Sequence, residues 1–208
     1  MESNKINILT RKMSSKGFTL LELIIVIGIL AILGSVSVLV LNPAELFRQA
    51  RDSSRVQDLS TMASAIGQYV SSVPNLDLNG TYANAECASG AGGKVYVYAS
   101  PTTQSFANRG GGYTVVASRS ITGGATSWLP VPFNDITTGS PIASVPTDPT
   151  NSGDLIYRYA CDQGPATFEL NATFESAKYT TGTDEKLTKD GGDNDSFYEI
   201  GTDPGLNL

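Results

Sequence analysis

The sequence predicts an α+β fold in which a long N-terminal helix packs on a small antiparallel β-sheet. Three observations predict it. Residues 18–41 form an apolar run, residues 44–73 carry apolar side chains at helical spacing, and the stretch after Pro74 contains short strand-like runs. These features divide the chain of 208 residues into a basic segment (1–17), an apolar helix (18–41), an amphipathic helix (42–74) and a β-rich globular domain (75–208).

The apolar run is long enough to cross a membrane. Its 24 residues include a single charged one, Glu22, and as a helix they extend over about 36 Å. Residues 1–17 carry four basic side chains against one acidic one, a net charge of +3, whereas the whole chain has a net charge of −6. This asymmetry predicts that the N-terminus lies in the cytoplasm and that everything after the run is exported.

The composition argues against several classes of function. The chain has no histidine, which removes the commonest general base and the commonest zinc ligand. The acidic net charge argues against a nucleic-acid-binding surface. No nucleophile–base pair, phosphate-binding loop or metal-ligand motif stands out, so we do not expect an enzyme.

The amphipathic helix presents an apolar face and several charges. The apolar positions are Leu59, Met62, Ala63, Ile66, Tyr69 and Val70. We expect this face to pack on the sheet and Arg48, Arg51 and Arg55 to be solvated. In an alternative interpretation, the arginines meet acidic surfaces of adjacent subunits or phospholipid headgroups. Pro43 marks an expected bend at the start of this helix.

The exported domain reads as a sheet of about three to five strands. Strand-like runs occur at residues 94–100, 111–120, 154–160 and 166–174, and the last two are separated by the turn sequence CDQGP, which predicts a hairpin. Alternation of Phe168, Leu170 and Ala172 with polar residues predicts a strand that is buried on one face. Because the domain is exported, Cys87 and Cys161 are expected to pair as a disulfide.

The N-terminal sequence KGFTLLELIIVIGIL resembles the start of type IV pilins and the related pseudopilins. The resemblance rests on a basic leader, Gly17, Phe18 and a lone glutamate, Glu22, four residues after Phe18. It covers about 30 residues directly and implies the pilin fold for the rest. The segment SVPTDPTNSGDLIYRY also resembles the Pro-x-Asp-Pro turn that precedes the sheet in many pseudopilins and some pilins.

The resemblance implies how the chain is processed and assembled. Prepilin peptidase removes residues 1–17 by cleaving after Gly17, and Phe18 becomes the N-methylated first residue. The product is a single-pass protein of the cytoplasmic membrane, which assembly machinery polymerises into a homo-oligomeric, helical surface filament. Glu22 is expected to pair with the Phe18 amine of a neighbouring subunit during assembly.

Three functions remain open from the sequence. The first is a filament subunit for adhesion, twitching motility or DNA uptake, and the second is a pseudopilin of a type II secretion system. The third is a membrane-tethered binding module that does not polymerise, in which Tyr96, Tyr98 or Arg109 contacts a ligand.

The acidic C-terminal segment, TDEKLTKDGGDNDSFYEIGTDPG, contains possible ligands for a calcium ion. Major pseudopilins bind calcium in a C-terminal loop, so Asp190, Asp193 and Asp195 are the candidate calcium ligands here. A solvated acidic loop is the alternative, and no other cofactor is expected.

Overall fold

The structure is a computed structural model that describes residues 17–80, 86–88, 90, 92–102, 109–110 and 112–203, except for the side chain of residue 39. The chain divides into two compact units, Met1–Pro43 and Ala44–Leu208. The first contains helix α1 (Leu20–Leu41). The second contains nearly all of helix α2 (Pro43–Ser72) together with the globular domain, and is called the body below.

Helix α1 begins at a side-chain cap and is apolar on all sides. The Thr19 hydroxyl accepts a hydrogen bond from the Glu22 amide at 3.2 Å, which satisfies one of the amides left free at a helix N-terminus. The span Leu20–Val38 has a mean hydropathy of 2.6 and none of it is buried. Its length and composition are sufficient to cross a membrane.

Helix α1 ends and helix α2 begins next to Pro43, where the sequence predicts a bend. Helix α1 ends at Leu41, and Asn42 adopts a left-handed conformation with φ of 40°. Asparagine tolerates this conformation better than most residues, and it commonly ends a helix. Pro43 is the first residue of α2, a position where its missing N–H group removes no helical hydrogen bond.

The sheet has five strands in the order β2-β1-β3-β4-β5. The strands are β1 (Val95–Val97), β2 (Tyr113–Val115), β3 (Arg158–Asp162), β4 (Thr167–Ala172) and β5 (Tyr198–Gly201). The predicted α+β fold is confirmed, and so is the β3–β4 hairpin, which pairs Tyr159 with Leu170. The sheet is mixed rather than wholly antiparallel, because β1 and β2 run parallel. Strand β5 was not predicted.

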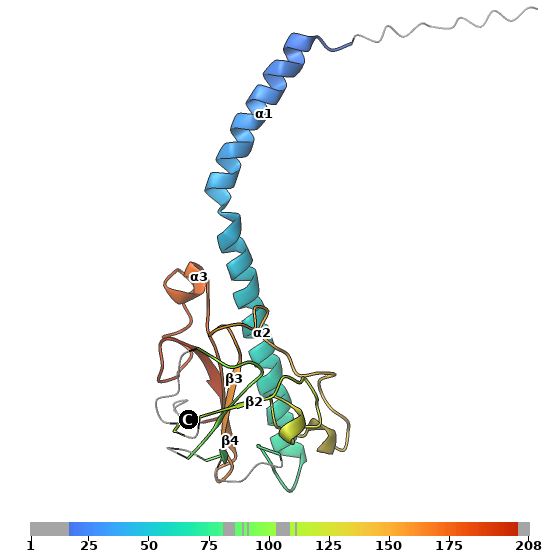
Figure 1. Ribbon diagram of the computed structural model, residues 1–208, viewed down its shortest axis with the longest axis vertical. Helices are drawn as coiled ribbons and strands as arrows, with labels where there is room; N and C mark the ends of the chain where they lie inside the picture. The colour runs from blue at the N-terminus through green and yellow to red at the C-terminus, as the bar shows by residue number, and fades with distance from the viewer. Residues whose placement is uncertain are drawn as a thin grey trace, which may run out of the picture. The chain divides into compact units, whose positions relative to one another are not determined.

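The main core lies between α2 and the sheet (Figure 1). Helix α2 contributes Leu59, Met62, Ile66 and Tyr69, and the sheet contributes Tyr96, Tyr159, Phe168 and Leu170. A long connection between β2 and β3 adds Trp128, Phe133 and Val145, although its only helical elements are two short 3-10 turns, η2 (Gly124–Thr126) and η3 (Phe133–Asp135). Much of the core therefore comes from irregular chain.

Glycine is required where this connection meets the chain that follows α2. Gly80 and Gly124 both have positive φ, and a Cβ atom on Gly80 would lie 2.3 Å from the Gly124 Cα atom. Only residues without side chains allow the two backbones to approach this closely.

Strand β4 differs from its predicted burial. Its polar face is also buried, since Glu169 and Asn171 are as inaccessible as Phe168 and Leu170. The same face carries Arg158 on β3, whose guanidinium lies 4.8 Å from the centre of the Phe197 ring. Residues of the C-terminal segment thus cover the outer face of the sheet, which alternation within one strand cannot reveal.

Candidate functional site

The predicted processing site lies at the start of the described residues. Phe18 is exposed, and a Cβ atom placed on Gly17 would meet nothing within 4 Å. Glu22 lies in the first turn of α1, where the positive end of the helix dipole favours a carboxylate. The basic residues of the leader, Lys16 included, lie outside the described residues.

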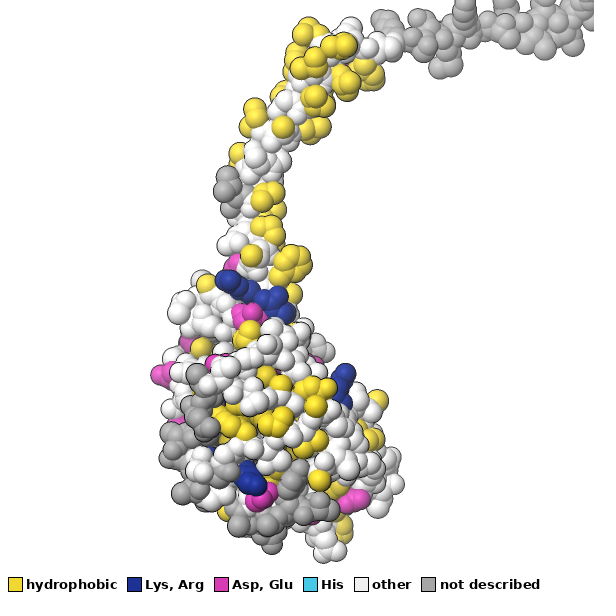
Figure 2. Space-filling model, viewed as in Figure 1, with side chains coloured by type: hydrophobic (Ala, Val, Ile, Leu, Met, Phe, Trp, Pro, Cys, Tyr) yellow, Lys and Arg dark blue, Asp and Glu magenta, His cyan; other side chains and the backbone are white. Residues whose placement is uncertain are grey.

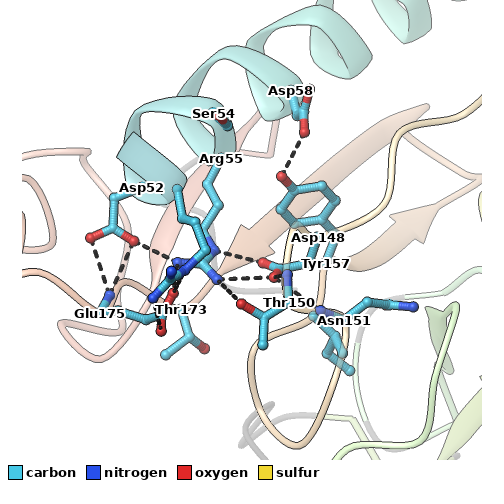
Figure 3. Close-up of polar contacts among 12 residues, drawn as sticks. Asp52, Ser54, Arg55, Asp58, Asp148, Thr150, Asn151, Tyr157, Thr173 and Glu175 are labelled. Carbon is cyan, nitrogen blue, oxygen red and sulfur yellow. Dashed lines mark hydrogen bonds and ion pairs between the residues drawn. The ribbon is translucent and has the colours of Figure 1, made fainter. Parts of the chain in front are cut away.

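A second candidate site holds α2 against the rest of the body. We call it the Arg55 clamp, and it consists of Arg51, Asp52, Arg55, Asp148 and Glu175 (Figure 3). The Arg55 side chain is fully buried. Its guanidinium donates two hydrogen bonds to Asp148, at 2.6 and 2.9 Å, from the loop before β3. It also donates to Asp52 at 2.6 Å, to Glu175 at 2.7 Å and to the Thr150 hydroxyl at 3.3 Å.

The clamp also fixes the chain that follows β4. Asp52 accepts hydrogen bonds from the backbone amides of Glu175 and Ser176, the latter at 2.7 Å. Arg51 donates to both carboxylate oxygens of Glu175, at 2.7 and 2.9 Å. A single turn of helix, α3 (Ala177–Thr180), begins directly after these residues. One face of α2 thereby positions two segments that lie about a hundred residues further along the chain.

The electrostatics of the clamp favour the charged form of each group whose pKa is shifted. Burial lowers the pKa of Arg55, but hydrogen bonds to Asp148, Glu175 and Asp52 outweigh it and raise the pKa above its usual value. The hydrogen bond from Arg51, helped by Arg55, lowers the pKa of Glu175 to about 2. Near neutral pH, Glu175 therefore stays ionised and Arg55 keeps its proton, so neither group serves as a general acid or base. The chemistry of the clamp is therefore that of a structural tie.

Two expectations about arginines are corrected by the clamp. Arg55 is neither solvated nor available to neighbouring subunits or headgroups, and Arg51 is bound to Glu175 of the same chain. Arg48 remains exposed, as predicted. A sequence signal existed, because Asp52 and Arg55 continue the spacing of Leu59, Met62 and Ile66 and so lie on the buried face.

The two cysteines lie within bonding distance. Cys87 and Cys161 form a disulfide with Cα atoms 4.9 Å apart. Cys161 belongs to β3, and the Cys87 carbonyl accepts a hydrogen bond from the Gln163 amide at 2.9 Å. The disulfide therefore attaches the connection after α2 to the end of the central hairpin.

The three aspartates of the calcium hypothesis are not brought together. Asp190 accepts hydrogen bonds from the amides of Gly192 and Glu199, which closes a local turn. In the described ranges no group of three or more acidic or cysteine side chains is arranged to hold a metal ion. Calcium binding stays a prediction. Instead, burial and the charges of Asp190 and Asp193 raise the pKa of Glu199, on neighbouring β5, to about 7.

Comparison with known proteins identifies the N-terminal segment. A family model described as the prokaryotic N-terminal methylation motif matches residues 12–38, which include Gly17, Phe18 and Glu22. No curated protein and no solved structure gave a significant match to the chain. The N-terminal segment of this chain therefore carries the methylation motif found in the precursors of type IV pilins and pseudopilins, followed by an apolar helix long enough to anchor a precursor in a membrane.

Proposed function

We propose that this chain is a structural subunit that is cleaved after Gly17, waits in the cytoplasmic membrane through α1, and then polymerises into a surface filament. The observation that carries the proposal is that the methylation motif coincides with an apolar helix of which no part is buried. Such a surface requires either lipid or other apolar helices around it. A filament core built from many copies of α1 provides the second environment.

Glu22 gives the filament its register in this proposal. It is the single charged residue between residues 18 and 41, so the helix contains no partner for it. A carboxylate in an apolar bundle is strongly destabilising unless it is paired. Cleavage after Gly17 creates a cationic amine on Phe18. Each subunit can then place this amine beside the Glu22 carboxylate of a neighbour.

The experiment combines mass spectrometry of surface-sheared material with substitution of Glu22. We expect a mature chain that begins at N-methylated Phe18 and is recovered from long fibres. Glu22→Ala is expected to leave membrane insertion intact and to reduce fibre yield at least tenfold. Asp135→Ala, which removes an exposed carboxylate from the body, is the control. Normal fibre yield from the Glu22→Ala strain contradicts the proposed pairing.

A pseudopilin of a type II secretion system is the second candidate. It is supported by the Asp148–Pro149 turn before β3, which resembles the turn of many pseudopilins and which Arg55 holds through two hydrogen bonds to Asp148. The test is deletion of this chain. A strain that stops secreting exported proteins after the deletion, and whose parent carries no fibres at its surface, would favour this candidate over a pilin.

The non-polymerising binding module has less support. Of its three candidate contact residues, Tyr96 and Arg109 are buried. The Arg109 guanidinium donates to the backbone carbonyls of Lys94 and Cys161, so it is used inside the body.

A further inference from the structure

The body carries an amphipathic surface at the end where α2 begins. Leu46 and Phe47 are 51 % and 67 % exposed, which is unusual for large apolar side chains of the body. Arg48 follows them on α2, with 53 % of its side chain exposed. Figure 2 shows basic side chains beside hydrophobic ones in this region.

Helix α3 belongs to the same surface. The Ala177 amide, at the start of α3, donates a hydrogen bond to the Glu45 side chain at 2.7 Å, and the Arg55 clamp fixes the two residues before it. Lys178 on α3 is 40 % exposed. We call the set of Leu46, Phe47, Arg48 and Lys178 the collar. Leu46, Phe47 and Arg48 are consecutive on α2, and the hydrogen bond between Ala177 and Glu45 brings Lys178 to them from far along the chain.

From these features we infer that the collar rests on the headgroup region of the membrane that holds α1, and that it binds anionic lipid there. The inference rests on the membrane-anchored state of the proposed function. Phe47 lies six residues after the end of α1, and a chain of six residues spans at most about 20 Å. The headgroup layer extends about 5–8 Å beyond the hydrocarbon on each side. The length of the connection therefore allows the collar to lie at that layer.

The chemistry of the collar matches that layer. Aromatic and aliphatic side chains insert at the boundary of the acyl chains, and arginine and lysine extend to the phosphates. The acidic neighbours oppose this only weakly. Arg48 and Lys178 lie 3.7 Å from Glu45 and Asp184, respectively, in long ion pairs whose basic partners are exposed, so phosphate groups can compete for both cations. Arg51 takes no part, because Glu175 holds it.

The test uses tryptophan as a depth probe in the intact precursor, reconstituted into phosphatidylethanolamine–phosphatidylglycerol vesicles. The sole native tryptophan, Trp128, is buried and gives a constant background. Phe47→Trp places a probe in the collar, Thr181→Trp places one at the exposed C-terminal cap of α3, three residues after Lys178, and Val115→Trp places a matched exposed probe on β2. Brominated lipids then quench the probes that contact the bilayer. Thr181 is the decisive position, because the tether alone keeps Phe47 near the membrane.

We expect lipid quenching of the Phe47→Trp and Thr181→Trp probes to be at least twofold stronger than that of the Val115→Trp probe. Quenching of the Thr181→Trp probe should fall to the level of Val115→Trp in the Arg48→Gln/Lys178→Gln background or in purely zwitterionic vesicles. Equal quenching at Thr181 and Val115 overturns the inference. A Thr181→Trp spectrum that changes only in assembled fibres also overturns it and assigns the collar to contacts between subunits. Resistance of the precursor to carbonate extraction from the vesicles is measured in parallel. Loss of this resistance means that α1 does not anchor the chain, whereas weak quenching of a carbonate-resistant precursor means that the collar does not contact lipid.

Discussion

Replacement of Arg55 by alanine is expected to lower the free energy of unfolding of the body by about 3–5 kcal/mol. Arg55 makes five hydrogen bonds, and four of them go to carboxylates. Added separately at 1.5–3 kcal/mol each, these bonds alone would exceed about 6 kcal/mol. That sum is too large, because each carboxylate keeps other donors when Arg55 is removed. Asp148 retains the amides of Thr150 and Asn151, Asp52 retains those of Glu175 and Ser176, and Glu175 retains Arg51.

The loss is measured by urea unfolding of the full chain in detergent, with Trp128 fluorescence as the probe. The Trp128 indole donates to the Pro146 carbonyl at 2.9 Å, two residues before Asp148, so the signal reports on the segment that the clamp holds. Arg55→Lys keeps the charge but cannot form the bidentate bond to Asp148, and we expect it to lose about half as much.

Arg48→Ala is the matched control on the same helix. Its side chain is exposed and forms one long ion pair with Glu45 at 3.7 Å. Its loss should stay below about 1 kcal/mol. If Arg55→Ala costs no more than Arg48→Ala, the clamp does not hold the body together and the reasoning is refuted.

Two further predictions concern the body. The double variant Cys87→Ala/Cys161→Ala should have a free energy of unfolding that is lower by about 4 kcal/mol, because the disulfide joins residues 74 positions apart and restricts the unfolded chain. Urea unfolding measures the difference, and an unchanged midpoint would contradict the prediction. Glu175 has its pKa lowered from 4.5 to about 2, so its stabilising effect is complete above about pH 4.5 and is lost as the pH falls through 2. The stability difference between the wild type and Glu175→Gln should therefore shrink by about 1–2 kcal/mol between pH 5 and pH 2, whereas a difference independent of pH would argue against the ionised pair.

The parts of the fold that depend on local pattern were predictable. The all-apolar run predicted α1, and Pro74 marked the region where α2 ends. The CDQGP turn, together with the alternation around Phe168 and Leu170 that comes after it, predicted the central hairpin. The N-terminal motif is equally local, because leader charge, glycine, phenylalanine and glutamate all fall within a few residues.

The parts that depend on distant partners were not predictable in the same way. Helical spacing alone can place Arg55 on the buried face of α2, but it cannot identify its partners Asp148 and Glu175, which lie far along the chain. Strand β5 lies inside an acidic run, so its short sequence YEIG does not stand out as a strand. The buried polar face of β4 depends on the C-terminal segment that covers it. In each case, packing between distant segments overrides local propensity.

The position of the clamp along α2 has a mechanical consequence. In the proposed filament, a pull on α1 would enter the body at the first residues of α2. Arg51, Asp52 and Arg55 lie within the first four turns of that helix, and their bonds lead to the loop before β3 and to the chain after β4. Such a pull would therefore meet the charged contacts to the start of β3 and to the chain after β4 before the apolar contacts of Leu59 and Met62.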